Sequence, residues 1–201
     1  NLENSYYIPN PSDSSFEKLD NYKNDQPNDM FFAMSHGVHR GVLKRGKTDN
    51  REIFLKKLIY LGEHKINFDF YGFGEKQPIW GDDFLDKISN SKMGLNLSRG
   101  RPLKYYSSDR ISQLFGNGLL TFIDKKTQLD NFFNSEEAVF YNDISDLIDK
   151  ILKYKKDDKK RKLIAKNGKL KYMKYFNSNL VSQYMIDQIF DFKSKYKYIC
   201  I

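Results

Sequence analysis

Short apolar runs alternate with amphipathic stretches along most of the chain, and this pattern predicts alternating strands and helices. Residues 30–34 are continuously apolar, as in a strand that is buried on both faces of a parallel sheet. Residues 50–61 have helical spacing, with an inward stripe of Ile53, Phe54, Leu58 and Leu61. The same criteria predict further strands at 66–71, 93–97, 119–123 and 138–141, and further helices at 82–88, 107–116, 144–152, 158–176 and 179–192.

Strands separated by helices indicate β-α-β units with right-handed crossovers. We therefore expect a Rossmann-like α/β fold, with a parallel sheet of about five strands and helices on both faces. Residues 1–28 are rich in Asn, Pro, Asp and Ser and are interpreted as a linker or an entry segment. Residues 29–176 form the predicted domain, and residues 177–201 a C-terminal helix and tail.

The charge of the chain is concentrated in one segment. The 34 Lys and Arg and 26 Asp and Glu give a net charge of +8, and residues 153–174 alone carry ten Lys, one Arg and two Asp. The remainder is therefore close to neutral, which argues against a nucleic-acid-binding face. Two interpretations of residues 153–174 stay open: a solvated helical face, or a contact with an anionic membrane surface.

Three further features bear on location. No apolar run approaches the roughly 20 residues of a membrane span, and no signal peptide is visible. Cys200 is the single cysteine. We expect a cytoplasmic protein, which the membrane alternative would place at the inner face of the membrane.

Basic and glycine-rich loops follow the predicted strands, where ligands bind in such folds. The predicted helix that begins near Ser107 offers free backbone N–H groups, the hydroxyls of Ser107 and Ser108, and Arg110. Such a helix start suits a phosphate or diphosphate. His36 and His39 are spaced as a metal-binding pair, but no third ligand lies near them. No GxGxxG or Walker pattern is present either, so no metal or dinucleotide cofactor is expected. The candidate binding residues are Gly37, Arg40, Arg45, Gly72, Arg99, Lys104, Ser107, Ser108, Asp109, Arg110 and Gln113.

Residues 99–123, RGRPLKYYSSDRISQLFGNGLLTFI, resemble the second domain of GT-B-fold glycosyltransferases, in particular the spore-maturation-type group. That group carries an Arg, two residues and an acidic residue at a helix start, then a small-residue-Cys-Gly turn and an apolar strand. Arg110 matches the Arg, and Gly118 matches the turn Gly. Gln113 stands where the acidic residue is usual, and Asn117 where Cys is usual.

The resemblance implies a donor-binding half of a glycosyltransferase that acts in cell-envelope glycan synthesis. The acidic position contacts the ribose of the nucleotide sugar, and basic residues of the loop at 35–47 contact the diphosphate. The catalytic base would come from an acceptor-binding domain that precedes this segment, and the C-terminal helix would pack on that domain. A non-enzymatic regulatory domain that binds an anion or a protein is the alternative.

Overall fold

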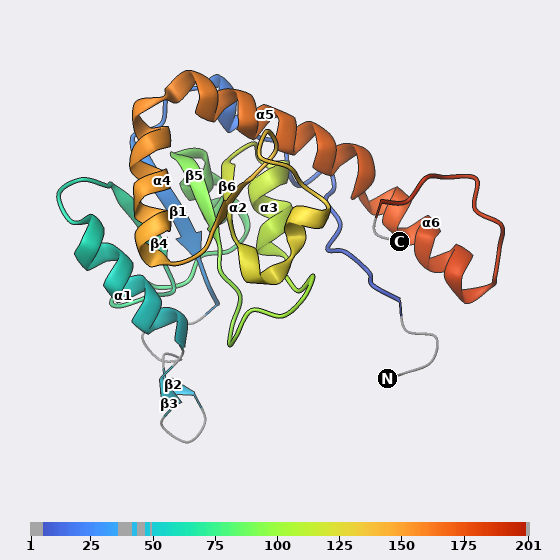
Figure 1. Ribbon diagram of the computed structural model, residues 1–201, viewed down its shortest axis with the longest axis horizontal. Coiled ribbons are helices and arrows are strands. Elements are labelled where there is room, and N and C mark those ends of the chain that lie inside the picture. The colour runs from blue at the N-terminus through green and yellow to red at the C-terminus, as the bar shows by residue number, and fades with distance from the viewer. Residues whose placement is uncertain (1–5, 36–41, 44–46, 49, 200–201) are drawn as a thin grey trace.

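A five-stranded parallel sheet forms the centre of the protein (Figure 1). The computed structural model describes residues 6–35, 42–43, 47–48 and 50–199. The strand order is β4-β1-β5-β6-β7, with every neighbouring pair parallel. The strands are β1 (Asn28–Ala33), β4 (Phe68–Tyr71), β5 (Ser91–Asn96), β6 (Leu120–Asp124) and β7 (Val139–Tyr141). The predicted fold class is confirmed, and each predicted strand lies within a few residues of its expected place.

Helices cover both faces of this sheet. Helices α1 (Asn50–Gly62) and α4 (Ile144–Lys156) pack on one face, against a core that includes Met30, Phe32 and Leu95. Helices α2 (Gly81–Ser89) and α3 (Arg110–Gly116) pack on the other face, against Phe31 and Leu119. The strands are apolar on both sides because both faces are buried, as expected for a parallel sheet. Short 3-10 turns occur at Asn21–Lys23, Lys125–Thr127 and Leu129–Asn131.

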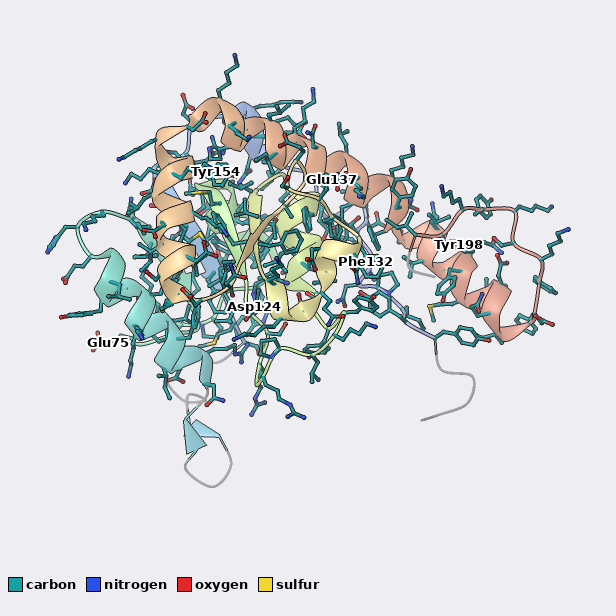
Figure 2. The ribbon with its side chains drawn as sticks, viewed as in Figure 1. Glu75, Asp124, Phe132, Glu137, Tyr154 and Tyr198 are labelled. Atoms are coloured by element: carbon teal, nitrogen blue, oxygen red, sulfur yellow. The ribbon has the colours of Figure 1, made fainter. Side chains whose placement is uncertain are left out.

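The last two helices continue beyond the sheet. Helix α5 (Asp158–Tyr175) contributes Ile164 to the core beneath α4 and Tyr172 to a second core beside α3. Helix α6 (Ser178–Ile189) extends away from the sheet (Figure 1). The chain after α6 folds back on it, since the Tyr198 hydroxyl donates to Asp187 at 2.7 Å (Figure 2).

Two local predictions were wrong. Ile53 and Leu61 do not face inward, because they are 60% and 41% exposed. The buried stripe of α1 is Arg51, Leu55, Leu58 and Gly62, which has the same helical period but is rotated around the axis. The loop at 35–47 was expected to lack regular structure, yet it contains part of a short antiparallel pair, β2 (Val42–Leu43) with β3 (Lys47–Thr48).

The N-terminal segment packs on the domain instead of standing apart from it. The backbone N–H of Ser12 donates to the carbonyl of Phe176 at 2.9 Å. Buried Asn21 donates through Nδ2 to the carbonyls of Ile88 (2.7 Å) and Ser91 (3.0 Å). Residues 12–26 therefore belong physically to the same packed unit as the sheet.

Candidate functional site

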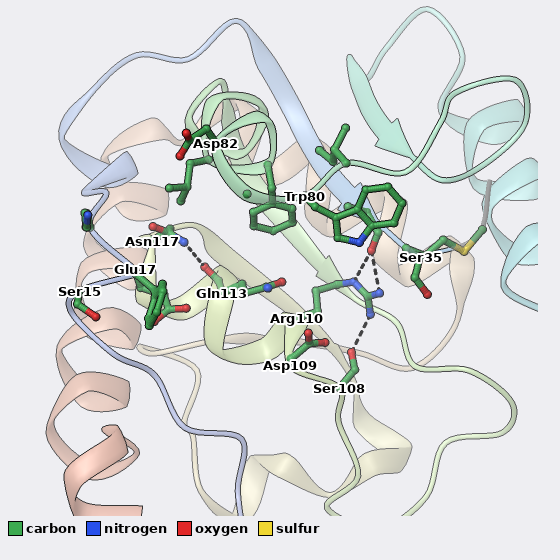
Figure 3. Close-up of a pocket in the computed structure, with 18 of the residues that line it drawn as sticks. Ser15, Glu17, Ser35, Trp80, Asp82, Ser108, Asp109, Arg110, Gln113 and Asn117 are labelled. Atoms are coloured by element: carbon green, nitrogen blue, oxygen red, sulfur yellow. Dashed lines mark hydrogen bonds between the residues drawn. The ribbon is translucent and has the colours of Figure 1, made fainter.

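The strand order creates a crevice between β1 and β5. After β1 the chain crosses to β4 on one side, and after β5 it crosses to β6 on the other side. The two connections diverge, so a gap opens beyond the carboxyl ends of these strands. A cleft of about 640 Å³ lies there, lined by residues from 15–18, 33–35, 79–85 and 108–117 and by Arg51 (Figure 3). We call it the switch-point cleft.

Arg110 spans the base of this crevice. Its Nε and Nη2 donate to the carbonyl of Ala33, at the end of β1, at 2.9 and 2.8 Å. Its Nη1 donates to the carbonyl of Leu97, just after β5, at 2.9 Å. The same Nη1 donates to Ser108 Oγ at 3.0 Å (Figure 3). A guanidinium has five N–H groups, so one on Nη2 has no partner among the described residues. Arg110 thus ties two strand ends together while lining the cleft.

A second arginine shares this part of the cleft. Arg51, in the first turn of α1, is 8% exposed and lines the cleft together with Arg110, which is 6% exposed. Burial, together with the like charge of Arg51, lowers the pKa of Arg110 to about 10. Asp109 partly offsets this repulsion. Two buried guanidinium groups make this part of the cleft electropositive, which favours an anionic ligand.

Other residues of the lining supply aromatic and hydrogen-bonding surface. Trp80 precedes α2 and keeps 63% of its side chain exposed at the rim (Figure 3). Gly81 follows it with a φ of +57°, which glycine adopts without strain. Gln113 and Asn117 lie one helical turn apart on α3, and Glu17 of the N-terminal segment joins them. The cleft therefore combines cationic side chains for an anion, amide and carboxylate oxygens for polar hydrogens, and an aromatic surface for a flat ring.

The predicted site residues fall into three groups. Ser108, Asp109, Arg110 and Gln113 line the cleft as one cluster. Gly72, Arg99, Lys104 and Ser107 do not line it, although Ser107 donates to Asn96 at 3.0 Å beside its base. Gly37, Arg40 and Arg45 lie outside the described residues.

The expected start of α3 needs a correction. Neither Ser107 nor Ser108 caps the helix, because α3 begins at Arg110 and Asp109 occupies the N-cap position without a side-chain bond. The helix has only seven residues, and its Ile111 N–H already donates to the Ser108 carbonyl at 3.1 Å. Among the described residues, the cations that line the cleft are its two buried arginines and Lys18, so an anion would be held by side chains and not by the start of this short helix.

Sequence reasoning missed Arg51, Trp80 and Glu17. For Arg51 a signal was available: positions 51, 55, 58 and 62 share one helical face, and a buried arginine next to leucines is unusual. Nothing local marks Trp80 or Glu17, because their place in the cleft depends on how distant segments pack.

The comparisons with known proteins agree with this architecture. The profile of a family described as "Glycosyl transferase-like" matches residues 49–187. No curated protein matches the sequence.

Solved structures with the same fold include TarM, with a TM-score of 0.61 at 13% identity over 96% of this chain and 40% of that one. Sucrose-phosphate synthase from Thermosynechococcus elongatus matches with a TM-score of 0.59 at 12% identity over 92% of this chain and 53% of that one. Anabaena Alr3699/HepE in complex with UDP gives a TM-score of 0.52 at 12% identity over 70% of this chain and 36% of that one. The chain therefore spans about a third to a half of these proteins.

Proposed function

Because the chain belongs to the glycosyl transferase-like family, we propose that it is the donor-binding half of a glycosyltransferase, which transfers a sugar from a nucleotide sugar to an acceptor. The observation that carries this proposal is the pair of buried arginines, Arg51 and Arg110, at the β1/β5 switch point. The HepE structure, which shares the fold, holds UDP. The finer assignments, to the spore-maturation-type group and to cell-envelope glycan synthesis, are also proposals.

In this proposal the diphosphate lies against the arginines. The remaining N–H of Arg110 and the charge of Arg51 would stabilise the negative charge that develops on the leaving diphosphate when the bond to the sugar breaks. The predicted residues Arg40 and Arg45 follow β1 in the chain and would add to this charge. No metal or other cofactor is invoked for this role.

The nucleoside would then occupy the remaining walls. Gln113, one turn along α3 from Arg110, would meet the ribose through its amide. The exposed ring of Trp80 would offer the base a stacking surface.

A second domain would complete the enzyme, and α6 offers a surface for it. Ile186, Ile189 and Phe190 are 43%, 70% and 63% exposed on and just after this helix, which extends away from the sheet. Tyr6 and Ile8 of the N-terminal segment line a groove with α6 and are also exposed. We propose that the acceptor-binding domain, with the catalytic base, covers this apolar surface.

We also propose a peripheral contact between α5 and an anionic membrane at the cytoplasmic face. Leu163 and Leu170, seven positions apart on one side of α5, are 51% and 56% exposed. Lys159 and Lys166 share that side and have no ion pair among the described residues, whereas five other lysines of residues 153–174 form ion pairs. Those paired lysines are Lys155, Lys160, Lys162, Lys169 and Lys171. No helix in the described part of the chain is long and apolar enough to span a membrane.

A calorimetric panel of UDP, ADP, GDP and inorganic pyrophosphate against the chain tests the donor-binding proposal. We expect one nucleoside diphosphate to bind more tightly than pyrophosphate and than its own uncharged nucleoside. Arg51→Met should weaken the diphosphate by about tenfold or more, since charge-assisted hydrogen bonds contribute about 1.5–3 kcal/mol each. The exposed Arg101→Met is the matched control and should not. Binding of pyrophosphate alone would favour the regulatory anion-binding alternative, and binding of nothing would refute the site.

A further inference from the structure

The chain after α6 folds back and forms one wall of a groove beside α5. Tyr198 anchors this tail, because its hydroxyl donates to Asp187 at 2.7 Å and its ring packs edge-on against Tyr184, with the ring centres 4.9 Å apart. The next residue, Ile199, packs against the second core beside α3. These contacts place Lys197, which precedes both residues, against the last turns of α5.

The groove has a volume of about 500 Å³ and is electropositive. Its lining contains Lys171, Lys174 and Lys197, and Glu137 is the single carboxylate among the described residues that line it (Figure 2). Glu137 accepts from Lys171 at 2.7 Å and thereby neutralises that lysine. Lys174 and Lys197 form no ion pair with any described residue, so the groove keeps a net charge of +2.

Apolar side chains share the lining with these two ammonium groups. Phe132, Tyr175 and Ile199 line the groove. The ammonium of Lys174 lies 4.9 Å from the centre of the Tyr175 ring. Leu170 is also in the lining and keeps 56% of its side chain exposed. A cationic site with apolar walls suits a ligand that joins an anionic group to hydrocarbon.

The position of the groove relates it to the membrane and not to the donor. Leu170 belongs both to the groove and to the side of α5 for which a membrane contact is proposed, and Lys174 lies one turn further along that helix. Among the described residues, none lines both this groove and the switch-point cleft. A ligand in the groove would therefore be reached from the proposed membrane face and would not compete with a nucleotide.

The charge of the groove indicates the kind of anion that fits. A phosphomonoester carries a charge of about −1.5 to −2 near pH 7 and has three acceptor oxygens. Two unpaired ammonium groups match that charge better than they match the single charge of a phosphodiester.

We propose that this groove binds the phosphomonoester headgroup of an anionic lipid, with Lys174 and Lys197 against the phosphate and Leu170 beside the acyl chains. This inference rests on the proposed membrane contact of α5 and adds to it a defined site with a ligand class.

Cosedimentation with vesicles tests the proposal. One kind of vesicle contains phosphatidylcholine alone, a second adds phosphatidylglycerol, which is a phosphodiester, and a third adds phosphatidic acid, which is a phosphomonoester. The two anionic kinds are mixed to equal surface potential, so that diffuse attraction is the same for both. The groove variant is Lys174→Met with Lys197→Met. The control variant, Lys193→Met with Lys195→Met, removes the same charge from exposed tail residues outside the groove.

We expect the unmodified chain to bind the phosphatidic acid vesicles about fivefold to tenfold more tightly than the phosphatidylglycerol vesicles. The groove variant should lose this preference, and the control variant should keep it. Equal binding of the two anionic vesicles by the unmodified chain, or a preference that survives in the groove variant, overturns the inference. The first of these results needs no variant, and all four replaced lysines are exposed, so the packed core is unchanged.

Two further outcomes separate this inference from its neighbours. Glycerol 3-phosphate is the soluble part of the same headgroup, and we expect it to displace the vesicles only weakly. If it binds as tightly as the vesicles, the groove serves a soluble phosphate and the lipid assignment is wrong. If the unmodified chain binds no anionic vesicle, the membrane contact of α5 fails and this inference fails with it. If both anionic vesicles bind equally, the contact of α5 stands and only the groove site fails.

Discussion

Replacing Arg110 by methionine tests whether this arginine holds the two strand ends together. Methionine keeps an unbranched apolar side chain in the packed site but removes four hydrogen bonds, to the carbonyls of Ala33 and Leu97 and to Ser108. A buried carbonyl left without a partner costs about 1–3 kcal/mol, which gives about 2–6 kcal/mol for the two strand ends.

An opposing effect reduces this cost. Burial, with the like charge of Arg51, lowers the pKa of Arg110 from 12.5 to about 10, so the buried charge itself is unfavourable. A pKa lowered by that much corresponds to about 3 kcal/mol of destabilisation from the buried charge. The methionine variant has no charge at this position and therefore avoids that destabilisation. With a cost near the middle of that range, about 4 kcal/mol, and a relief of about 3 kcal/mol, we expect a net loss of about 1 kcal/mol in the free energy of unfolding.

Thermal and urea unfolding measure this loss. For a chain of this length about 1 kcal/mol lowers the melting temperature by roughly 2–4 °C. Arg110→Lys keeps the positive charge, but one ammonium group cannot reproduce the fork between two carbonyls, so it should be destabilised to a similar extent. The exposed Arg101→Met is the control and should change stability by less than about 0.5 kcal/mol.

The result that refutes this reasoning is an Arg110→Met variant as stable as the unmodified chain. Stability restored by lysine would also count against it, because charge would then matter more than geometry. Arg110 also has one N–H left for a ligand. Arg110→Met should therefore weaken the binding of a nucleoside diphosphate about tenfold, and the binding of the uncharged nucleoside much less. Unchanged diphosphate affinity in the folded variant would confine Arg110 to the structural role.

Three further predictions follow from particular contacts. Gly168→Ala should lower the stability of the protein in urea unfolding by about 1–2 kcal/mol, because the added Cβ would lie 2.3 Å from the Glu137 carbonyl oxygen. This cost should exceed the gain from the better helix propensity of alanine, and a gain in stability would contradict the packing. Two lysine partners lower the pKa of Asp20 from 3.8 to about 2, so this carboxylate stabilises the fold above pH 4 and loses that contribution as the pH falls toward 2. Since its side chain is 32% exposed, we expect Asp20→Asn to cost about 1 kcal/mol at pH 7 and nothing near pH 2, and a pH-independent cost would be contrary to this. Lys159→Glu with Lys166→Glu should reduce cosedimentation with anionic vesicles at least tenfold, while binding that is equal for neutral and anionic vesicles would remove the membrane proposal.

The order of strands and helices was predictable because each element carries its own pattern. The apolar run at 30–34 and its counterparts can only be buried on both faces, and helical spacing marks the covering helices. Errors occurred where two helical faces had similar patterns. In α1 the choice between the stripe of Ile53 and that of Arg51 depended on which side met the sheet.

The candidate site was only partly predictable. Arg110 and Gln113 were identified from local sequence, but the bonds of Arg110 to Ala33 join residues 77 positions apart, and no nearby residue signals them. Glu17 reaches the cleft because Asn117 holds Leu19 across 98 positions. Hydrophobic periodicity acts over a few turns of chain and thereby determines elements. The partners of a buried polar group are set by which distant backbone groups need a donor or an acceptor when the core closes, and that is decided only in the tertiary structure.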